Sequence, residues 1–314
     1  MDTIAIFGDL LYDCFIWSDR LPRVGETVTG YASGFFASGK GGNQAMVCAR
    51  LGARALMLGK VGRDERGDFV LATLEKNGVD TEGVLRDPEN PTGTDCVMVA
   101  EGGQNLIVVA PNATAKITAA EVDAMRPFFE RAGSALFQLQ VNPDAVARAM
   151  RLAHDCGCAV ILNPAPACEV PEELFALADY VTPNETEAEF FTGIRREGRS
   201  LEDWCAAAGE ALHGKGVRRL IITLGEHGSY YSDGERRFVC PAFPVEAVDS
   251  TAAGDAFNGG LAVRLAAGDS LQEALRYASA CGALTTTRRG SVTSLPDDAE
   301  ARAFLAARTD GQTN

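Results

Sequence analysis

The apolar positions of this chain follow two alternating patterns along most of its length. Short apolar runs are typical of strands buried on both faces, and longer stretches with an apolar residue every three to four positions are typical of amphipathic helices. Strands are predicted over residues 3–7, 56–58, 135–139, 159–162, 180–182 and 219–223. Helices are predicted over residues 44–51, 69–76, 119–129, 144–156, 172–176, 185–192, 200–212, 256–267, 271–285 and 297–307. This alternation predicts an α/β fold with a mainly parallel central sheet covered by helices on both faces.

Several short segments do not follow this alternation and predict a second, smaller sheet. Residues 94–100 and 106–109 are β-branched runs joined by a glycine-containing turn, which is the pattern of a hairpin. Short strands are also predicted over residues 14–17 and 26–30, and they are expected to pair with this hairpin. Another hairpin is predicted over 230–232 and 237–239. The chain has no internal repeat and no long linker, so residues 1–314 are expected to form a single domain.

Composition and charge restrict the possible functions. A hydrophobic fraction of 46% in 314 residues is enough for a full core. The net charge of −14 and the absence of a basic run argue against a nucleic-acid partner. The nine cysteines are irregularly spaced and there are only three histidines, which favours reduced thiols, mostly in the core, in a cytoplasmic protein. We see no signal peptide and no apolar run long enough for a membrane partner.

The stretch from Val248 to Gly260 carries the strongest chemical signal. Small residues from Ser250 to Gly254 allow a tight turn and a close approach of the backbone to a ligand, and a helix follows. A helix N-terminus presents unpaired N–H groups that suit an anion. Asp255 in the first turn is then placed to take a proton from a hydroxyl that attacks a phosphate. The alternative is that Asp255 only compensates the helix dipole.

A glycine-rich segment precedes the helix predicted over residues 44–51. Residues 34–40 fit the spacing G-x-x-x-x-G-K of a phosphate loop, but Gly41 follows where Ser or Thr would bind magnesium. The remaining interpretation is a glycine loop in which Lys40 and Asn43 donate hydrogen bonds to sugar hydroxyls. A plain strand-to-helix turn is the alternative.

Many polar clusters follow predicted strands, where ligands of parallel sheets bind. They are residues 9–13, 138–140, 163, 184–187 and 223–228. Glu187 is a candidate for holding magnesium through water, although acids in a first helical turn are mostly dipole compensation. The turn at residues 225–228 is by itself weak evidence for a ligand site, because any hairpin can use such a turn. The turn that follows Arg288 is either solvated or a source of carbonyl ligands for a cation beside Asp249.

Six motifs together resemble the ribokinase-like (PfkB) carbohydrate kinases, a family of sugar and nucleoside kinases, over nearly the whole chain. They are residues 25–30, 39–45, 163–167, 182–189, 222–225 and 248–259. The resemblance implies a three-layer α/β fold with a small β-sheet lid, formed here from about residues 14–37 and 94–110. It also implies an ATP-dependent kinase that phosphorylates a primary hydroxyl of a small sugar, ribose first, in a homodimer formed through the lid.

The resemblance also implies roles for individual residues. Asp255 would be the catalytic base, and the backbone of Ala252, Ala253 and Gly254 would bind the transferring phosphoryl group. The sugar site would comprise Leu11, Asp13, Gly39, Lys40, Gly41, Gly42, Asn43, Gln140 and Asp255. The ATP site would comprise Asn184, Thr223, Gly225, Glu226, His227, Gly228, Gly254 and Ser279. Magnesium would lie near Glu187. A monovalent cation, potassium, would be surrounded by Asp249, Thr251, Thr285, Arg288, Gly290 and Ser294, partly through carbonyls.

Two residues depart from the family pattern at the sugar site. Leu11 stands where these enzymes usually carry Asn, and Gln140 stands where they usually carry Glu. A buried hydroxyl that loses its partner costs about 1–3 kcal/mol, enough to shift preference away from ribose. Another furanose, a deoxy sugar or fructose is therefore an alternative substrate. So is a nucleoside, whose base would contact Leu11, Tyr12 and Phe36. A non-catalytic sugar sensor is the second alternative.

Overall fold

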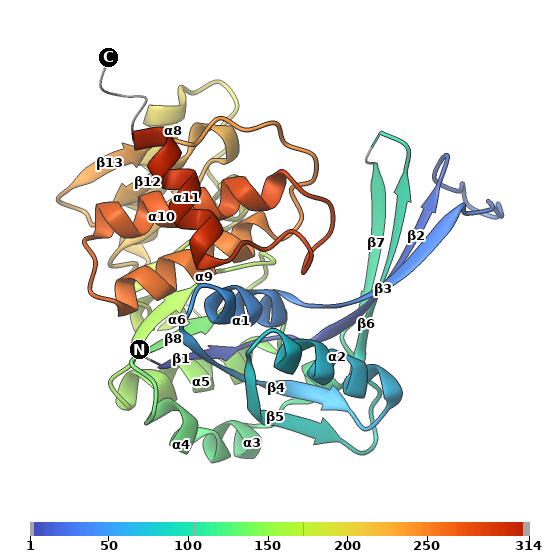
Figure 1. Cartoon of the computed structure of the whole chain (residues 1–314). Helices are drawn as coiled ribbons and strands as arrows, with labels where there is room; N and C mark the ends of the chain where they lie inside the picture. The colour runs from blue at the N-terminus through green and yellow to red at the C-terminus, as the bar shows by residue number, and fades with distance from the viewer. Residues whose placement is uncertain (1–2, 103, 172, 310–314) are drawn as a thin grey trace.

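A nine-stranded sheet forms the centre of the computed structural model, which describes residues 3–102, 104–171 and 173–309 (Figure 1). In spatial order its strands are β13 (Arg237–Cys240), β12 (Ser229–Ser232), β11 (Leu220–Thr223), β10 (Tyr180–Val181), β9 (Ala159–Leu162), β8 (Ser134–Phe137), β1 (Thr3–Phe7), β4 (Arg54–Gly62) and β5 (Asp80–Asp87). The strands from β11 to β5 pair in parallel, and β12 and β13 add an antiparallel hairpin at one edge. The predicted mainly parallel sheet is confirmed.

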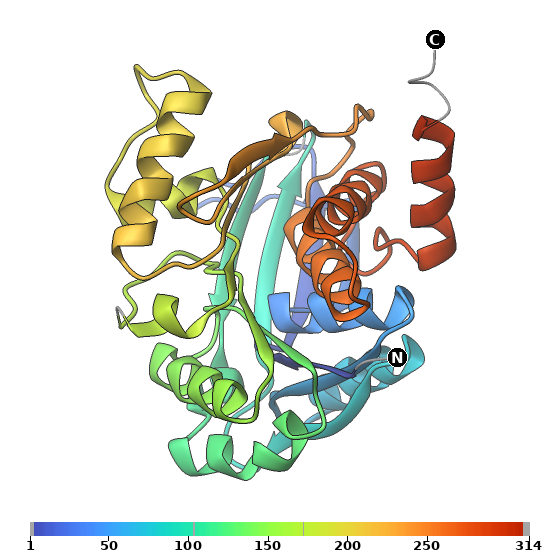
Figure 2. The ribbon, with the colours of Figure 1, turned by 90° about the vertical axis from the view of Figure 1, so that its left-hand side faces the viewer.

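Helices cover both faces of this sheet (Figure 2). One layer contains α1 (Lys40–Arg50), α2 (Glu65–Lys76), α9 (Ala253–Ala266), α10 (Leu271–Thr286) and α11 (Asp298–Thr309). The other contains α3 (Ala119–Ala124), α4 (Arg126–Phe129), α5 (Pro143–Asp155), α6 (Glu173–Leu177), α7 (Glu185–Thr192) and α8 (Leu201–Gly214). Alternate residues of β1 face the two layers, because Ile4 and Ile6 pack with α1 and α9 whereas Ala5 and Phe7 pack on the α5 side. This burial on both faces explains the continuous apolar runs of the sequence.

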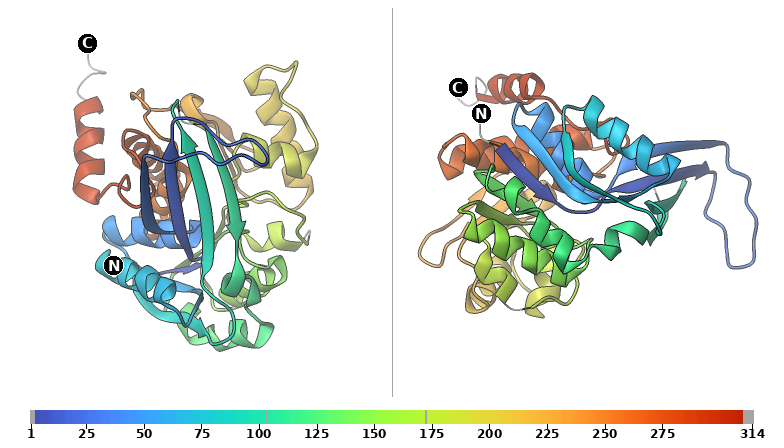
Figure 3. Two further views of the ribbon diagram at one scale, coloured as in Figure 1. Left: turned by 90° about the vertical axis from the view of Figure 1, so that its right-hand side faces the viewer. Right: turned by 90° about the horizontal axis from the view of Figure 1, so that it is seen from below.

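A separate four-stranded sheet projects from the main body (Figures 1 and 3). Its strands, in spatial order, are β3 (Ala32–Ser38), β2 (Leu11–Ser18), β6 (Gly93–Ala100) and β7 (Asn105–Ala110). The outer pairs are antiparallel and the central pair, β2 with β6, is parallel. The expected second sheet is therefore present, and its first strand begins at Leu11 rather than at residue 14.

Some predicted elements are wrong in position. Residues 26–30 form no strand. They belong to an exposed loop after a turn at Gly25. The strand that pairs with β2 in this part of the chain is β3, which begins at Ala32. Strand β5 was not predicted, because this half-exposed edge strand has a mixed sequence with little apolar periodicity. The helix predicted over 119–129 is divided into α3 and α4, and Pro127 lies in the first turn of α4.

The remaining global expectations concern cysteines and membranes. All nine cysteines are free thiols, and four of them, Cys48, Cys158, Cys205 and Cys281, are buried. The expectation that most cysteines lie in the core is therefore too broad. Among the described residues, no helix combines the length and the apolar character needed to cross a membrane.

Candidate active site

The N-terminus of α9 presents backbone N–H groups beside a buried carboxylate, that of Asp255. Ala252, at the N-cap, adopts a left-handed conformation with φ of 60°, which turns the chain sharply into the helix. The helix geometry leaves the N–H groups of Gly254 and Asp255 without intrahelical acceptors, while the N–H of Ala253 donates to the carbonyl of Ser250 at 3.2 Å. A Cβ added at Gly254 would meet no atom within 4 Å, so open space adjoins this turn.

Asp255 is held by two amide side chains from α1. Asn43 Nδ2 donates to Asp255 Oδ2 at 2.9 Å, and Gln44 Nε2 donates to Asp255 Oδ1 at 3.0 Å. Burial raises the pKa of Asp255, and the positive charge of Lys40 and these two hydrogen bonds partly oppose that rise. The result is a fixed carboxylate that is more basic than an exposed aspartate, as a general base requires.

Further amides support this carboxylate from the ends of the central strands. Gln44 Nε2 also donates to Asn163 Oδ1 at 3.2 Å, and Gln138 Nε2 donates to Gln44 Oε1 at 2.5 Å. Asn163 in turn donates to the carbonyl of Thr182 at 3.1 Å. No role of their own was predicted for Gln44 and Gln138 from the sequence. Their only signal was a polar residue at the end of a buried strand or at the start of a buried helix.

Helix α1 begins four residues earlier than predicted, so Lys40 and Asn43 lie in its first turn rather than in a loop. The N–H of Gly41 donates to Asp9 Oδ1 at 2.9 Å, and the N–H of Gly42 donates to the Asp9 carbonyl at 3.1 Å. A Cβ at Gly41 would lie 2.8 Å from backbone atoms of Asp9. This glycine is therefore explained by the close approach of α1 to the end of β1.

A cavity of about 1850 Å³ lies between the small sheet and the start of α9. Its lining includes seven of the residues predicted for the sugar site: Leu11, Asp13, Gly39, Lys40, Asn43, Gln140 and Asp255. Gly41 and Gly42 do not line it; they pack on the strand end described above. The alternation of β2 directs Leu11, Asp13, Phe15 and Trp17 toward the cavity. Tyr12 instead packs between Phe35 and Phe69.

Most residues predicted for ATP lie around the ends of β10 and β11, whereas Gly254 is in the first turn of α9. Asn184 and Thr223 form a β-bridge, and residues 225–227 form a 3₁₀ turn. At Gly228, φ is 92° and a Cβ would lie 2.0 Å from the carbonyl oxygen of Cys240, so only glycine fits the turn. Ser279 on α10 reaches the same region through a hydrogen bond with Cys240. These residues are outside the lining of the large cavity.

Glu187 has a structural role in this region. Asn184 Oδ1 accepts from the Glu187 N–H at 2.8 Å, and Glu187 Oε2 accepts from the Asn184 N–H at 2.8 Å, which is a capping box for α7. Burial raises the pKa of Glu187, with the nearby charge of Lys40 acting in the opposite direction. The carboxyl group is therefore both a helix cap and a candidate for an outer position on a metal ion.

The residues predicted for a monovalent cation join two loops through Asp249. Asp249 Oδ1 accepts from the Thr251 hydroxyl at 2.7 Å, and Asp249 Oδ2 accepts from the Gly290 N–H at 2.9 Å. Burial alone would raise the pKa of Asp249, but these hydrogen bonds outweigh it and lower the pKa.

Three other members of this predicted set are engaged inside the protein. The side chain of Arg288 pairs with Glu300, so only its backbone is available for a cation. The hydroxyl of Thr285 donates to the Cys281 carbonyl, and that of Ser294 donates to the Ser291 carbonyl.

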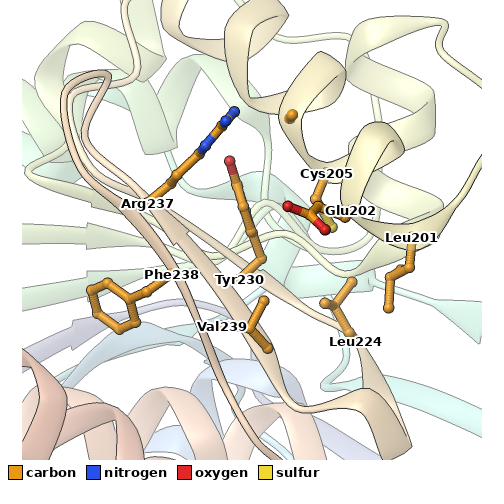
Figure 4. A pocket seen from close by; sticks show the side chains of 9 residues that line it. Leu201, Glu202, Cys205, Leu224, Tyr230, Arg237, Phe238 and Val239 are labelled. Carbon is orange, nitrogen blue, oxygen red and sulfur yellow. The ribbon is translucent and has the colours of Figure 1, made fainter.

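A second, smaller pocket of about 420 Å³ lies between α8 and the β12–β13 hairpin (Figure 4). Cys205 and Glu202 line it from α8, and Tyr230 and Phe238 line it from the hairpin. None of the predicted site residues lines this pocket, so the candidate chemistry belongs to the large cavity and the adjoining strand ends.

Comparison with known proteins decides the family. The model of the pfkB family carbohydrate kinases matches residues 1–298. The chain belongs to the pfkB carbohydrate kinase family. Membership makes it a phosphotransferase with an alcohol group as acceptor. The resemblance found in the sequence and the α/β fold that it implied are both confirmed.

Individual members of the pfkB family cover nearly the whole chain. The ribokinase of Bacillus subtilis is 35% identical over 98% of this chain and 100% of its own. A deoxyribokinase of Salmonella typhi is 31% identical over 96% of this chain and 98% of its own. The structure of Arabidopsis thaliana ribokinase, complexed with ribose and ATP, superposes with a TM-score of 0.88 at 30% identity, covering 97% of this chain and 98% of that one.

Proposed function

We propose that this pfkB family kinase transfers the γ-phosphoryl group of ATP to a primary hydroxyl of a small sugar, with D-ribose, which gives ribose 5-phosphate, as the first candidate acceptor. The observation that carries the proposal is the buried Asp255 carboxylate, oriented by Asn43 and Gln44 at a helix N-terminus that opens onto the large cavity. The relatives named ribokinase, and the ribose and ATP bound to the Arabidopsis enzyme, support the same substrates.

The mechanism follows from what these residues do. Asp255 takes the proton of the sugar hydroxyl, and the N–H groups at the start of α9 stabilise the charge of the phosphoryl group. Asp13, Lys40 and Asn43 position the sugar in the cavity. The nucleotide lies along the ends of β10 and β11, where Asn184, Thr223, residues 225–228 and Ser279 gather.

Two cations complete the proposal. Glu187 would hold Mg²⁺ through water beside the nucleotide phosphates, and the ion would supply neutralisation of their charge. The donor set fits, because Mg²⁺ in kinases needs only one or two carboxylates and Glu187 at the start of α7 can supply one. A potassium ion at the Asp249 loops would hold the start of α9 in place through carbonyls.

We further propose that the small sheet is a lid and a dimer interface in a cytoplasmic homodimer. Its strands β2 and β6 present one face to the cavity, which a closing motion would shield from water. Exposed apolar side chains on β7 and β3, among them Leu106, Val108 and Phe35, support a contact with a second copy. Gel filtration at several protein concentrations tests this, and a monomer at all of them would contradict the interface.

The substrate is tested by ADP release from ATP with Mg²⁺ and K⁺ over ribose, 2-deoxyribose, fructose and several nucleosides. We expect ribose to support turnover, with Asp255→Asn as the inactive control. Leu11 and Gln140 both line the cavity, and a relative is named deoxyribokinase, so 2-deoxyribose is the second candidate. Strong activity on 2-deoxyribose with weak activity on ribose would make these two residues the specificity switch. No turnover with any acceptor, despite sugar binding, would favour a sugar sensor.

A further inference from the structure

Asp95 on β6 lies beside Asp13 on β2 and was not among the residues predicted from the sequence. The two strands are parallel and Asp13 is the register partner of Asp95, so both side chains stand on the same face of the small sheet. Both residues line the large cavity. Asp13 is 4% exposed and Asp95 is 9% exposed. A pair of carboxylates is thus buried in the wall of the cavity that is formed by the small sheet.

Each carboxylate of this pair carries an oxygen without a partner. Oδ1 of Asp13 and Oδ1 of Asp95 are buried and accept no hydrogen bond within the described structure. Unpaired buried carboxylate oxygens are costly, and their position on a cavity wall indicates that a ligand supplies the missing donors. Neighbouring protein groups satisfy only part of the need, because among the described residues Ser38 is the one side chain that donates a hydrogen bond to Asp13.

Positive charge is scarce around the pair. The positive charge of Lys40 lowers the pKa of Asp95. The same ammonium group also lowers the pKa of Asp9, Asp255 and Glu187, so its charge is shared among four carboxyl groups. Asp9, which is fully buried, adds negative charge next to both members of the pair. The charge of Asp255 in turn raises the pKa of Asp9, so the negative charges of the pair and of the proposed catalytic end are coupled.

We propose that Asp13 and Asp95 form a subsite for an ammonium group of the sugar, so that the preferred acceptors of this kinase are amino sugars. The ammonium lies at the end of the sugar that is remote from the hydroxyl phosphorylated at Asp255. This inference rests on the proposed sugar kinase function and names the substrate class of the same site.

An ammonium group fits the pair better than neutral hydroxyls do. Burial and the charge of Asp95 raise the pKa of Asp13 to about 7, and burial and the charge of Asp9 raise the pKa of Asp95 to about 6. With a neutral sugar the two carboxyl groups therefore tend to hold a proton near neutral pH. An ammonium group allows both to ionise, and its three donors serve the two free oxygens.

The test compares matched sugars at pH 7. D-ribose, 2-amino-2-deoxy-D-ribose and 3-amino-3-deoxy-D-ribose are titrated into the full-length protein by calorimetry, with a non-hydrolysable ATP analogue and Mg²⁺ present. ADP release is measured in parallel with ATP. The variants are Asp95→Asn, which keeps the shape and removes the charge, and Asp95→Glu, which keeps the charge. Thermal unfolding is recorded for each variant to show that it folds.

We expect the wild-type protein to bind one of the two amino sugars at least about tenfold more tightly than ribose. Asp95→Asn should lower this ratio by at least about tenfold, and Asp95→Glu should restore part of it. A wild-type protein that prefers ribose to both amino sugars would overturn the inference, and so would a ratio that Asp95→Asn leaves unchanged.

The two proposals fail in different ways. Binding of an amino sugar that depends on Asp95, with no ADP release from any acceptor, would contradict the kinase function and support the subsite. Turnover of ribose together with indifference to the amine would support the kinase function and contradict the subsite.

Discussion

Asn43 Nδ2 lies 2.9 Å from Asp255 Oδ2, although the two residues are 212 positions apart in the sequence. Their meeting joins the first turn of α1 to the first turn of α9. Both residues line the cavity, Asn43 is proposed to position the sugar and Asp255 is the proposed base, so in the proposed mechanism one hydrogen bond links substrate positioning to proton transfer. The close packing of the two helices makes this possible, since a Cβ at Gly259 would lie 2.5 Å from Val47 Cγ1.

Asp255→Asn should reduce turnover by about 10²–10⁴-fold, because an amide cannot accept the proton of the sugar hydroxyl. ATP binding should change little, since the nucleotide residues lie at the ends of β10 and β11. ADP release measures the first effect and calorimetry with an ATP analogue measures the second. Asp144→Asn, at an exposed position, is the control. Near-wild-type turnover in Asp255→Asn would show that another group is the base.

Gln44→Met should shift the acidic limb of the pH–rate profile to higher pH. The hydrogen bond from Gln44 lowers the pKa of Asp255, so its removal raises that pKa, and the base stays protonated up to a higher pH. The variant should also lose about 1–3 kcal/mol of unfolding free energy, because the Gln138 amide and the Asn163 oxygen lose a partner.

The profile of kcat against pH checks this prediction, and chemical denaturation gives the stability. Gln44 does not line the cavity, so KM for the sugar should change less than kcat. An unchanged acidic limb would mean that Asp255 does not control it.

Two substitutions of Glu187 should separate its capping role from its proposed role near magnesium. Glu187→Gln keeps the capping box with Asn184 and removes the charge, so the melting temperature should stay close to that of the wild type. The Mg²⁺ concentration that gives half-maximal activity should rise in this variant. Glu187→Ala should raise that concentration as well and should also lose about 0.5–2 kcal/mol of unfolding free energy. An unchanged Mg²⁺ requirement in Glu187→Gln would leave the residue as a cap only.

Asp95→Asn should stabilise the ligand-free protein at neutral pH. The pKa of Asp95 is raised from 3.8 to about 6, so the unfolded state ionises first as pH rises and the wild type loses stability between about pH 4 and pH 6. The variant avoids this loss. Its free energy of unfolding should therefore exceed that of the wild type only slightly at pH 4 and by about 1–3 kcal/mol above pH 6. Urea unfolding at both pH values measures it, with exposed Glu202→Gln as the control. An equal difference at both pH values would contradict the raised pKa.

The sequence by itself determined the layers of this protein, because a sheet buried on both faces requires continuous apolar runs such as that of β1 and regular amphipathic helices between them. It also located Asp255, since a run of small residues before a helix is a local signal. Local patterns failed at β5 and β3, where half-exposed strands are not obliged to follow an apolar period.

Only the tertiary structure decided which side chains meet. Gln44, Gln138 and Asn163 come from different elements, and their shared role exists only because the ends of those elements converge on Asp255. Asp95 became significant through its register with Asp13, which pairing between β2 and β6 fixes. Contacts between residues far apart in the chain depend on strand order and helix packing, and no local pattern of residues records either of them.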